Sequence, residues 1–145
     1  MDNGVGARVA RAEVTAAPLS TDSLASGVAD PAAGALVTFD GRVRDHDGGR
    51  QVTAITYTAH PSATGVLVEI AQEVAERPGI RALGVAHRVG DLEVGETALA
   101  VAVSADHRQD AFAALAEIVE EVKRRLPMWK CQHLVDGSRE WANLG

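Results

Sequence analysis

Two lysines stand apart in this sequence because the other non-histidine basic residues are all arginines. The chain has 14 lysines and arginines among 145 residues, and only Lys123 and Lys130 are lysines. A lysine, unlike an arginine, can lose its proton when it is buried or placed beside another cation. A lysine with a lowered pKa can transfer a proton or attack a carbonyl carbon. These two residues are therefore the first candidates for catalysis.

Lys123 falls on the apolar stripe of a predicted helix. Helical spacing predicts a helix over residues 107–126, capped by Asp106 and ended by Pro127. Lys123 shares one face of that helix with five apolar residues: Phe112, Leu115, Ala116, Val119 and Leu126. A lysine there is either a helix-terminal cation that extends into solvent or a partly desolvated group in a pocket wall.

Further cations near the predicted ends of elements suit an anionic ligand. Lys130 follows the segment that ends the helix, so the turn can bring it back near Lys123. A helix start offers free backbone N–H groups and the positive end of the helix dipole to an anion. Each of these positions is also compatible with an ordinary solvated side chain. Four basic residues lie at a helix start or a strand end: His107, Arg108, Arg42 and Arg44.

Metal binding and thiol chemistry are competing interpretations. The five histidines and the single cysteine show no ligand spacing such as HExxH or CxxC, so we expect no metal site. Cys131 excludes an intramolecular disulfide and suits a reducing compartment. Strand alternation places Cys131 opposite Lys130, which predicts a buried, inert thiol. A sulfurtransferase that uses Cys131 would instead need an exposed thiol with a low pKa.

The predicted elements that position these residues interleave helices and strands without a strict β-α-β rhythm, which indicates the α+β class. Polar, glycine-bearing residues 45–50 predict a mobile loop, and residues 90–91 and 136–137 predict turns. In chain order we expect a short helix capped near residues 20–22, strands over 36–44 and 52–59, a helix from Pro61 to Pro78, strands over 80–89 and 97–104, the helix over 107–126 and a strand over 129–135.

Length and charge exclude several classes of protein. A chain of 145 residues is expected to form one domain. The net charge of −6 argues against non-specific nucleic-acid binding, which needs a basic surface. No apolar run approaches the roughly 20 residues that span a bilayer. The N-terminal residues lack the layout of a signal peptide, so we expect a cytoplasmic protein without a membrane partner.

Several blocks of this sequence occur together and in one order. They are residues 34–46 (GALVTFDGRVRDH), 86–92 (AHRVGDL), 95–96 (GE), 104–112 (SADHRQDAF), 123–130 (KRRLPMWK) and 136–137 (DG). With these blocks the chain resembles the large, catalytic subunit of molybdopterin synthase over about residues 34–141. Any one block is weakly specific, whereas the ordered set is highly specific.

The resemblance implies an α/β hammerhead-type fold of the α+β class, with a mixed or antiparallel sheet and two main helices. It implies one domain over residues 1–145, with residues 1–33 as an N-terminal segment outside the matching blocks. A homodimer would form the core of a heterotetramer, with one small ubiquitin-like sulfur carrier docked on each large subunit. The carrier's C-terminal Gly-Gly thiocarboxylate would give sulfur twice to cyclic pyranopterin monophosphate, making the molybdopterin dithiolene without a metal or redox cofactor.

The resemblance also assigns site residues. It implies that Lys123 is the catalytic lysine beside the thiocarboxylate and that Lys130 holds substrate close to it. The substrate-binding positions would be Arg44, His107 and Arg108 for pterin and phosphate, with Arg42 beside them and Phe39 lining the pocket. The site is expected to be assembled across the dimer interface.

One departure from the family pattern leaves an alternative open. Cys131 and Gln132 stand where the family typically has a basic residue followed by an acid. Gln132 can bind substrate through hydrogen bonds but cannot act as a base. The alternative is a non-catalytic paralogue that only docks a ubiquitin-like carrier. The presence of both Lys123 and Lys130 favours the enzyme, a sulfurtransferase.

Overall fold

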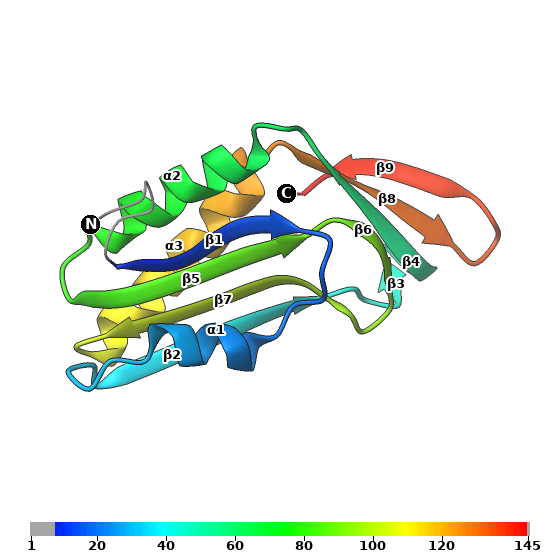
Figure 1. Ribbon diagram of the computed structural model, residues 1–145. Helices are drawn as coiled ribbons and strands as arrows, with labels where there is room; N and C mark the ends of the chain where they lie inside the picture. Colours follow the sequence, from blue (N-terminus) through cyan, green and yellow to red (C-terminus); the bar gives the residue numbers. More distant parts are fainter. Residues whose placement is uncertain (1–7, 145) are drawn as a thin grey trace.

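The computed structural model describes residues 8–144 and has three helices and nine strands (Figure 1). In chain order they are β1 (Val9–Thr15), α1 (Thr21–Val28), β2 (Ala35–Arg42), β3 (His46–Asp47), β4 (Arg50–Ala59), α2 (Ala63–Ala75), β5 (Ile80–Arg88), β6 (Gly90–Glu93), β7 (Thr97–Ala105), α3 (Arg108–Arg125), β8 (Met128–Leu134) and β9 (Arg139–Asn143). The α+β class is confirmed.

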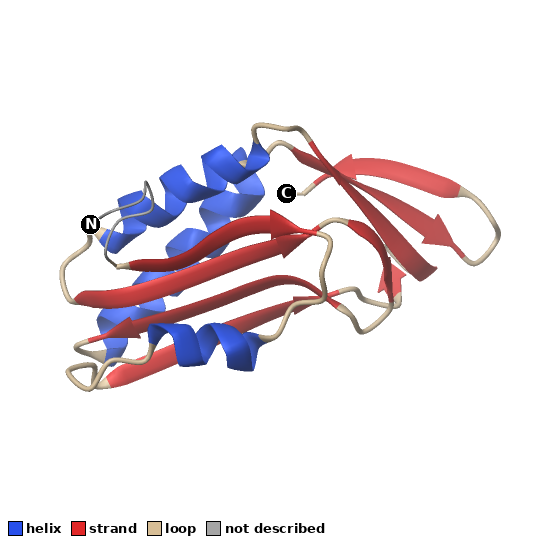
Figure 2. Cartoon of the chain, in the orientation of Figure 1, coloured by secondary structure: helices blue, strands red, loops and turns tan. Residues whose placement is uncertain are grey.

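The first sheet has the strand order β1-β5-β7-β2 and is mixed, because β1 pairs parallel to β5 while the other pairs are antiparallel. Helices α2 and α3 cover one face and α1 covers the other (Figure 2). Strand β7 is buried on both faces, which its small and branched apolar residues allow. Ala100 and Ala102 pack with Leu24 and Val28 of α1, and the alternate residues of β7 join the main core.

The second sheet is antiparallel, with the order β3-β4-β8-β9 and with β6 also paired to β4. It extends from the end of the first sheet at which β2 finishes and α3 ends (Figure 1). The β4–β8 register pairs Tyr57 with Lys130 and Ile55 with Gln132. Because paired residues share a face and alternate residues of a strand do too, the side chains of these four residues lie on one face of the sheet.

The predicted mobile loop over residues 45–50 is wrong. His46 and Asp47 form β3, which pairs with Gln51 and Arg50 in a tight hairpin. Gly48 and Gly49 connect the two strands with φ values of +58° and +80°. Two consecutive residues with positive φ are typical of a type I′ turn, whose twist matches that of the strands it joins.

Two local predictions nearby are also corrected. Residues 90–91 are not a turn but the start of β6, which pairs with β4, and the chain reverses after it at Gly95, where φ is +91°. Asp106 does not cap α3: its Oδ1 accepts a hydrogen bond from Arg81 Nε at 2.6 Å, and His107 is the N-cap residue. The predicted cap of α1 is confirmed, since Ser20 Oγ accepts from the backbone N–H of Ser23 at 3.1 Å.

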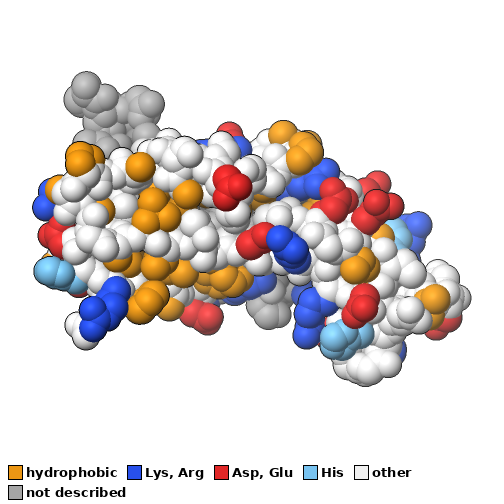
Figure 3. All heavy atoms as spheres, turned by 90° about the horizontal axis from the view of Figure 1, so that it is seen from below, with side chains coloured by type: hydrophobic (Ala, Val, Ile, Leu, Met, Phe, Trp, Pro, Cys, Tyr) orange, Lys and Arg blue, Asp and Glu red, His pale blue; other side chains and the backbone are white. Residues whose placement is uncertain are grey.

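The buried face of α3 agrees only in part with the predicted stripe. Leu126 is in the core and Leu115 and Val119 pack against it, but Phe112 is 58% exposed. The buried residues of the helix itself are Ala111, Ala114, Ile118 and Val122. The helix carries apolar residues on two neighbouring faces. The face that packs against the sheet begins with the small residues Ala111 and Ala114, whereas Phe112 lies on the other face. Hydrophobic side chains also remain at the surface elsewhere: seen from below, they gather on the half of the molecule that carries the first sheet (Figure 3).

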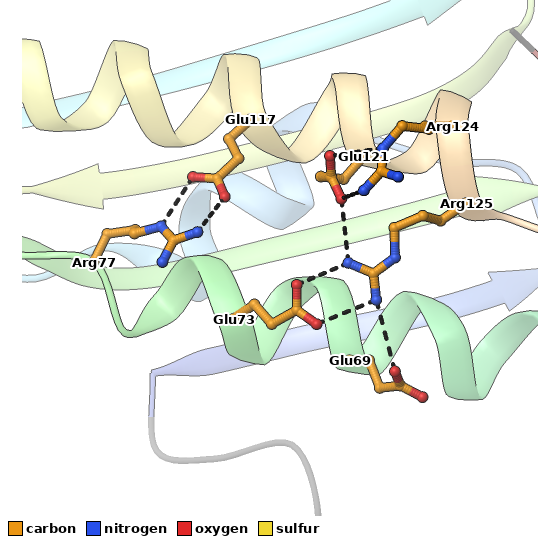
Figure 4. A network of polar contacts seen from close by, with 7 residues as sticks. All are labelled: Glu69, Glu73, Arg77, Glu117, Glu121, Arg124 and Arg125. Carbon is orange, nitrogen blue, oxygen red and sulfur yellow. Dashed lines mark hydrogen bonds and ion pairs between the residues drawn. The ribbon is translucent and has the colours of Figure 1, made fainter.

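Ion pairs hold α3 against α2 (Figure 4). Arg77 donates two hydrogen bonds to Glu117, at 3.1 and 2.6 Å, and Arg125 donates two to Glu73, at 2.8 and 3.1 Å. Arg125 also bonds Glu121 on its own helix at 3.2 Å. The contacts of Arg125 fix the last turn of α3, which carries Lys123, whereas Arg77 binds the middle of α3 from just beyond the end of α2. Within residues 8–144, none of the helices combines the length and apolarity that crossing a bilayer requires.

Candidate functional site

A pocket of about 320 Å³ lies where the two sheets meet the end of α3. Strand β2, the β3–β4 hairpin, α3 and β8 all contribute to it, so segments from residue 39 to residue 132 converge there. The lining residues are Phe39, Gly41, Arg42, Arg44, His46, Asp47, Val52, Ile55, Tyr57, Lys123, Lys130 and Gln132. Both lysines of the chain therefore line the same pocket.

Lys123 and Lys130 reach the pocket from the last turn of α3 and from β8. The Lys123 residue as a whole is exposed, yet the protein around its ammonium group desolvates it enough to lower the pKa. The charge of Lys130 lowers that pKa further, and Glu120 opposes the shift. The pocket thus holds a lysine that loses its proton more easily than a lysine in water.

Arg42 and Arg44 flank the mouth of the pocket, and both side chains are largely exposed. Arg42 is paired with Asp40 on its own strand, with Nε 2.9 Å from Oδ2, and this guanidinium keeps the pKa of Asp40 low. Arg44 lies farther from its acidic neighbour, with Nη2 3.8 Å from Asp47 Oδ1. Arg44 is therefore the arginine with more hydrogen-bonding capacity left for a ligand.

His107 and Arg108 do not reach this pocket. They lie at the start of α3, 16 residues before Lys123 in the case of His107. At a rise of 1.5 Å per residue, about 24 Å of helix separates these two positions. One copy of the chain therefore does not bring His107 and Arg108 together with the two lysines.

Phe39 lies in the pocket wall beside Gly41, and the two are closely packed. A Cβ atom added to Gly41 would lie 2.8 Å from Cε2 of the Phe39 ring. Glycine at this position therefore lets the aromatic ring lie flat against the strand. The resemblance implied that Phe39 lines the pocket, and Phe39 is one of its lining residues.

Gln132 is almost fully buried in the pocket wall and bonds Asp47, a residue that the sequence analysis did not single out. Its Nε2 donates to Asp47 Oδ2 at 2.9 Å. This hydrogen bond lowers the pKa of Asp47, as do the charges of Lys130, Arg44 and Arg50. Among the described residues, Oε1 of Gln132 is buried and has no hydrogen-bond donor. A buried polar atom left in this way costs about 1–3 kcal/mol.

Tyr57 and His46 are further pocket residues that sequence reasoning missed. Tyr57 is 8% exposed on β4, and burial raises the pKa of its hydroxyl. Two-residue alternation along β4 could have indicated Tyr57 and Ile55 as neighbours on one face. Their pairing with Lys130 and Gln132 of β8 could not be read from alternation, because it depends on the register between the strands.

Cys131 faces away from this pocket. It is 2% exposed, as strand alternation predicts, and it borders a separate cavity of about 430 Å³ on the opposite side of the second sheet. In the part of the chain that the structure describes, no group of three or more His, Cys, Asp or Glu residues is placed to hold a metal ion. The candidate site is therefore the cationic pocket.

Comparisons with known proteins indicate the family. A family model described as MoaE protein matches residues 14–125. The molybdopterin synthase catalytic subunit of Aspergillus clavatus is 42% identical over 130 residues, which cover 89% of this chain and 66% of that protein. The subunit of the same name from a Nostoc species is 35% identical over 134 residues, covering 91% of this chain and 81% of the relative.

Solved structures show the same fold. Molybdopterin synthase from Staphylococcus aureus superposes with a TM-score of 0.83 at 31% identity, covering 90% of this chain and 96% of that chain. The molybdopterin biosynthesis MoaE protein of Burkholderia ambifaria gives a TM-score of 0.74 at 30% identity, covering 93% and 90%. The match of the family model to most of the chain, together with relatives this similar over most of their own length, shows that the chain belongs to the MoaE protein family.

Proposed function

We propose that this chain is the catalytic subunit of a molybdopterin synthase. It would take sulfur from the C-terminal thiocarboxylate of a small ubiquitin-like carrier and place it on cyclic pyranopterin monophosphate, forming the molybdopterin dithiolene in two rounds. The observation that carries the proposal is the convergence of Lys123, Lys130 and Arg44 on one pocket at the junction of the two sheets.

The charges of the pocket suit both reactants. A phosphate and a thiocarboxylate are anions, and each is bound best by clustered cations in a partly shielded site. The thiocarboxylate sulfur would bond to a side-chain carbon of the pterin as an oxygen leaving group departs, and the lowered pKa of Lys123 would let it pass a proton to that oxygen. Water would then add to the carrier carbonyl, a protonated Lys123 would stabilise the resulting oxyanion, and the carbon–sulfur bond to the carrier would break, leaving sulfur on the pterin and a carboxylate on the carrier.

His107 and Arg108 enter the proposal through a second copy of the chain. The length of α3 separates them from Lys123 of the same protomer, so they would act on the pocket of the partner in a homodimer. With a carrier on each pocket the assembly would be a heterotetramer. The same fold occurs in a complex of subunits 1 and 2 of the molybdopterin-converting factor from Helicobacter pylori, which is 20% identical to this chain. The free thiol of Cys131 suits a reducing compartment such as the cytoplasm.

Reconstitution tests the activity directly. The purified chain is incubated with cyclic pyranopterin monophosphate and a thiocarboxylated carrier, and dithiolene product is measured for wild type, Lys123→Ala and Arg124→Ala. Arg124 is the matched control, since it is the next residue, is exposed and bonds Glu121. We expect product from wild type and Arg124→Ala and a loss of at least 100-fold in Lys123→Ala.

The non-catalytic paralogue remains the second candidate because of one observation, the amide of Gln132 at a position where the family typically has an acid. If the chain is a non-catalytic paralogue, the wild-type protein should bind the carrier but form no product at any pH. Turnover by wild type would eliminate it. Equal turnover by wild type and Lys123→Ala would instead mean that the reaction centre lies elsewhere.

Subunit mixing tests the assignment of His107 across the interface. Lys123→Ala and His107→Ala homodimers should each be inactive. After exchange of subunits, a mixed dimer contains one pocket with both wild-type groups, so activity should return to as much as about a quarter of the wild-type value in an equal mixture. No recovery in a mixture shown to have exchanged would place His107 in the same pocket as its own Lys123 or outside the site.

A further inference from the structure

One corner of the pocket accepts hydrogen bonds, although the rest of its polar lining consists mainly of donors. The cations Arg44 and Lys130 can only donate, whereas a carboxylate can only accept. Asp47 and Gln132, which we name the acceptor pair, lie side by side in this corner. An anion-binding pocket does not need this pair, so its presence requires a separate explanation.

The fold holds the acceptor pair rigidly. Asp47 belongs to β3 and is placed by the two-glycine turn that follows it, while Gln132 lies in the middle of β8 and is 4% exposed. Their side chains meet across 85 positions of sequence. Neither residue therefore depends on a loose loop for its position.

The orientation of the Gln132 amide follows from the charge of its partner. Asp47 is ionised because its pKa is held low, and an ionised carboxylate offers no proton. Gln132 must therefore present its nitrogen to Asp47, which leaves its oxygen as the unpaired atom. Oδ1 of Asp47 is part of a 42%-exposed side chain and is engaged by Arg44 only in a long ion pair, with Nη2 3.8 Å away. The pair thus offers one buried acceptor without a donor, Gln132 Oε1, and one accessible carboxylate oxygen that can accept a further hydrogen bond.

We infer that the acceptor pair binds N–H donors of a reactant and that Asp47 is a specificity-determining residue of the site. This inference rests on the proposed function. N–H groups of this kind occur on the heterocyclic edge of the pterin and on the backbone of the carrier's Gly-Gly tail. The cations would bind the anionic group of the same reactant. One end of the pocket would therefore bind negative charge and the other end N–H donors.

The pair also explains how Gln132 is tolerated. The negative charge that position 132 lacks is present 2.9 Å away, on Asp47, in hydrogen-bonded contact with the same amide. The pocket therefore retains a carboxylate, supplied by β3 in place of β8.

A reciprocal exchange tests the inference. Asp47→Asn converts the free acceptor at position 47 into an amide nitrogen, which repels an N–H donor. Gln132→Glu places two carboxylates against each other. The double variant Asp47→Asn/Gln132→Glu lets the asparagine nitrogen donate to the new carboxylate and restores both free acceptors. KM and kcat are measured with each reactant varied in turn, and Tm is recorded for every variant.

The expected result is a rise in KM of about tenfold or more in each single variant, with recovery to within about threefold of wild type in the double variant. The reactant whose KM responds is the one whose N–H groups are bound. Asp45→Asn is the control: it removes a charge from the same hairpin, its carboxylate bonds His46, and it should leave both KM values unchanged.

Three outcomes overturn the inference. Unchanged KM values in the single variants would mean that the pair binds no reactant. Effects of the two substitutions that multiply in the double variant, or a lowered Tm without a change in KM, would make the pair a structural contact only. If wild type forms no product, the proposed function fails first; if wild type is active and the single variants match it, only this inference fails.

Discussion

The imidazole ring of His87 lies edge-on to the phenol ring of Tyr57, with centroids 5.1 Å apart and planes inclined at 67°. Tyr57 lines the pocket, and His87 lies behind it on β5, 1% exposed. His87 Nδ1 lies 2.9 Å from the backbone oxygen of Arg88, which can only accept, so Nδ1 carries the proton. Burial lowers the pKa of His87 from 6.5 to about 4; the hydrogen bond to the backbone of Arg88 opposes this shift, and the charge of Lys123 lowers the pKa further.

This buried histidine should make the protein lose stability in mild acid. The unfolded chain takes up the proton near pH 6.5 and the folded chain only near pH 4, so the contribution is present above pH 6.5 and is lost as the pH falls between these values. We expect the free energy of unfolding to fall by about 2 kcal/mol from pH 7.5 to pH 5, a range above the ordinary pKa values of carboxylates. Urea unfolding at several pH values measures it.

The control for this slope is a histidine at the surface. His87→Asn, whose amide can retain the bond to Arg88, should remove most of the slope, even though it lowers stability at pH 7.5. His60→Gln changes an exposed histidine and should leave the slope intact. An unchanged slope in His87→Asn would show that His87 accepts a proton as readily in the folded protein as in the unfolded chain.

The two lysines allow a direct measurement of the pocket's electrostatics. Lysine labelled with ¹⁵N should give two side-chain signals, one from Lys123 and one from Lys130. We expect the signal of Lys123 to titrate below the ordinary lysine range, because burial and the charge of Lys130 both favour its neutral form. In Lys130→Gln the pKa of Lys123 should rise, since a like charge is removed. A pKa of Lys123 that stays the same in this variant would place the two ammonium groups too far apart to interact.

Arg125 should contribute more to stability than its neighbour Arg124. Arg125 bridges α2 and α3, with its side chain 23% exposed and two hydrogen bonds to Glu73 (Figure 4). Arg125→Ala should lower the free energy of unfolding by about 1–3 kcal/mol. Arg124 is 68% exposed and, among residues 8–144, pairs only within its own helix, so Arg124→Ala should lower the free energy of unfolding by much less than Arg125→Ala does. Equal effects in denaturant titrations would mean that the contact between the helices adds nothing beyond helix propensity.

Phe112 should be needed for the proposed homodimer. It is 58% exposed on α3, one turn after His107 and Arg108, and Leu36 on the neighbouring edge strand β2 is 45% exposed. Phe112→Asp should weaken dimerisation by about 100-fold or more, because a twofold interface loses the apolar contact twice. Sedimentation of Phe112→Asp and of the apolar control Phe112→Leu measures this. A dimer of wild-type affinity in Phe112→Asp would place the interface elsewhere.

Local pattern determined much of this protein from the sequence alone. Helical spacing, proline stops and β-branched runs located α2, α3, β2, β4, β5, β7 and β8, because these signals act between residues that are close along the chain. The scarcity of lysine singled out Lys123 and Lys130, and the segment between them is a short helix end and a strand start, so a return toward the same pocket was predictable. The ordered blocks of residues were enough to indicate the family.

Only the tertiary structure decided the rest. Helix α3 carries apolar residues on two neighbouring faces, and packing against the sheet, not the periodicity, determined that Ile118 is buried and Phe112 exposed. The partnership of Asp47 with Gln132 depends on the hairpin turn and on the β4–β8 register, which bring together residues 85 positions apart. Strand β9 pairs with β8 through a register that no local signal specified. Local interactions determine which segments form helices and strands, whereas long-range packing determines which of their faces are in contact. The chemistry of the pocket depends on those contacts.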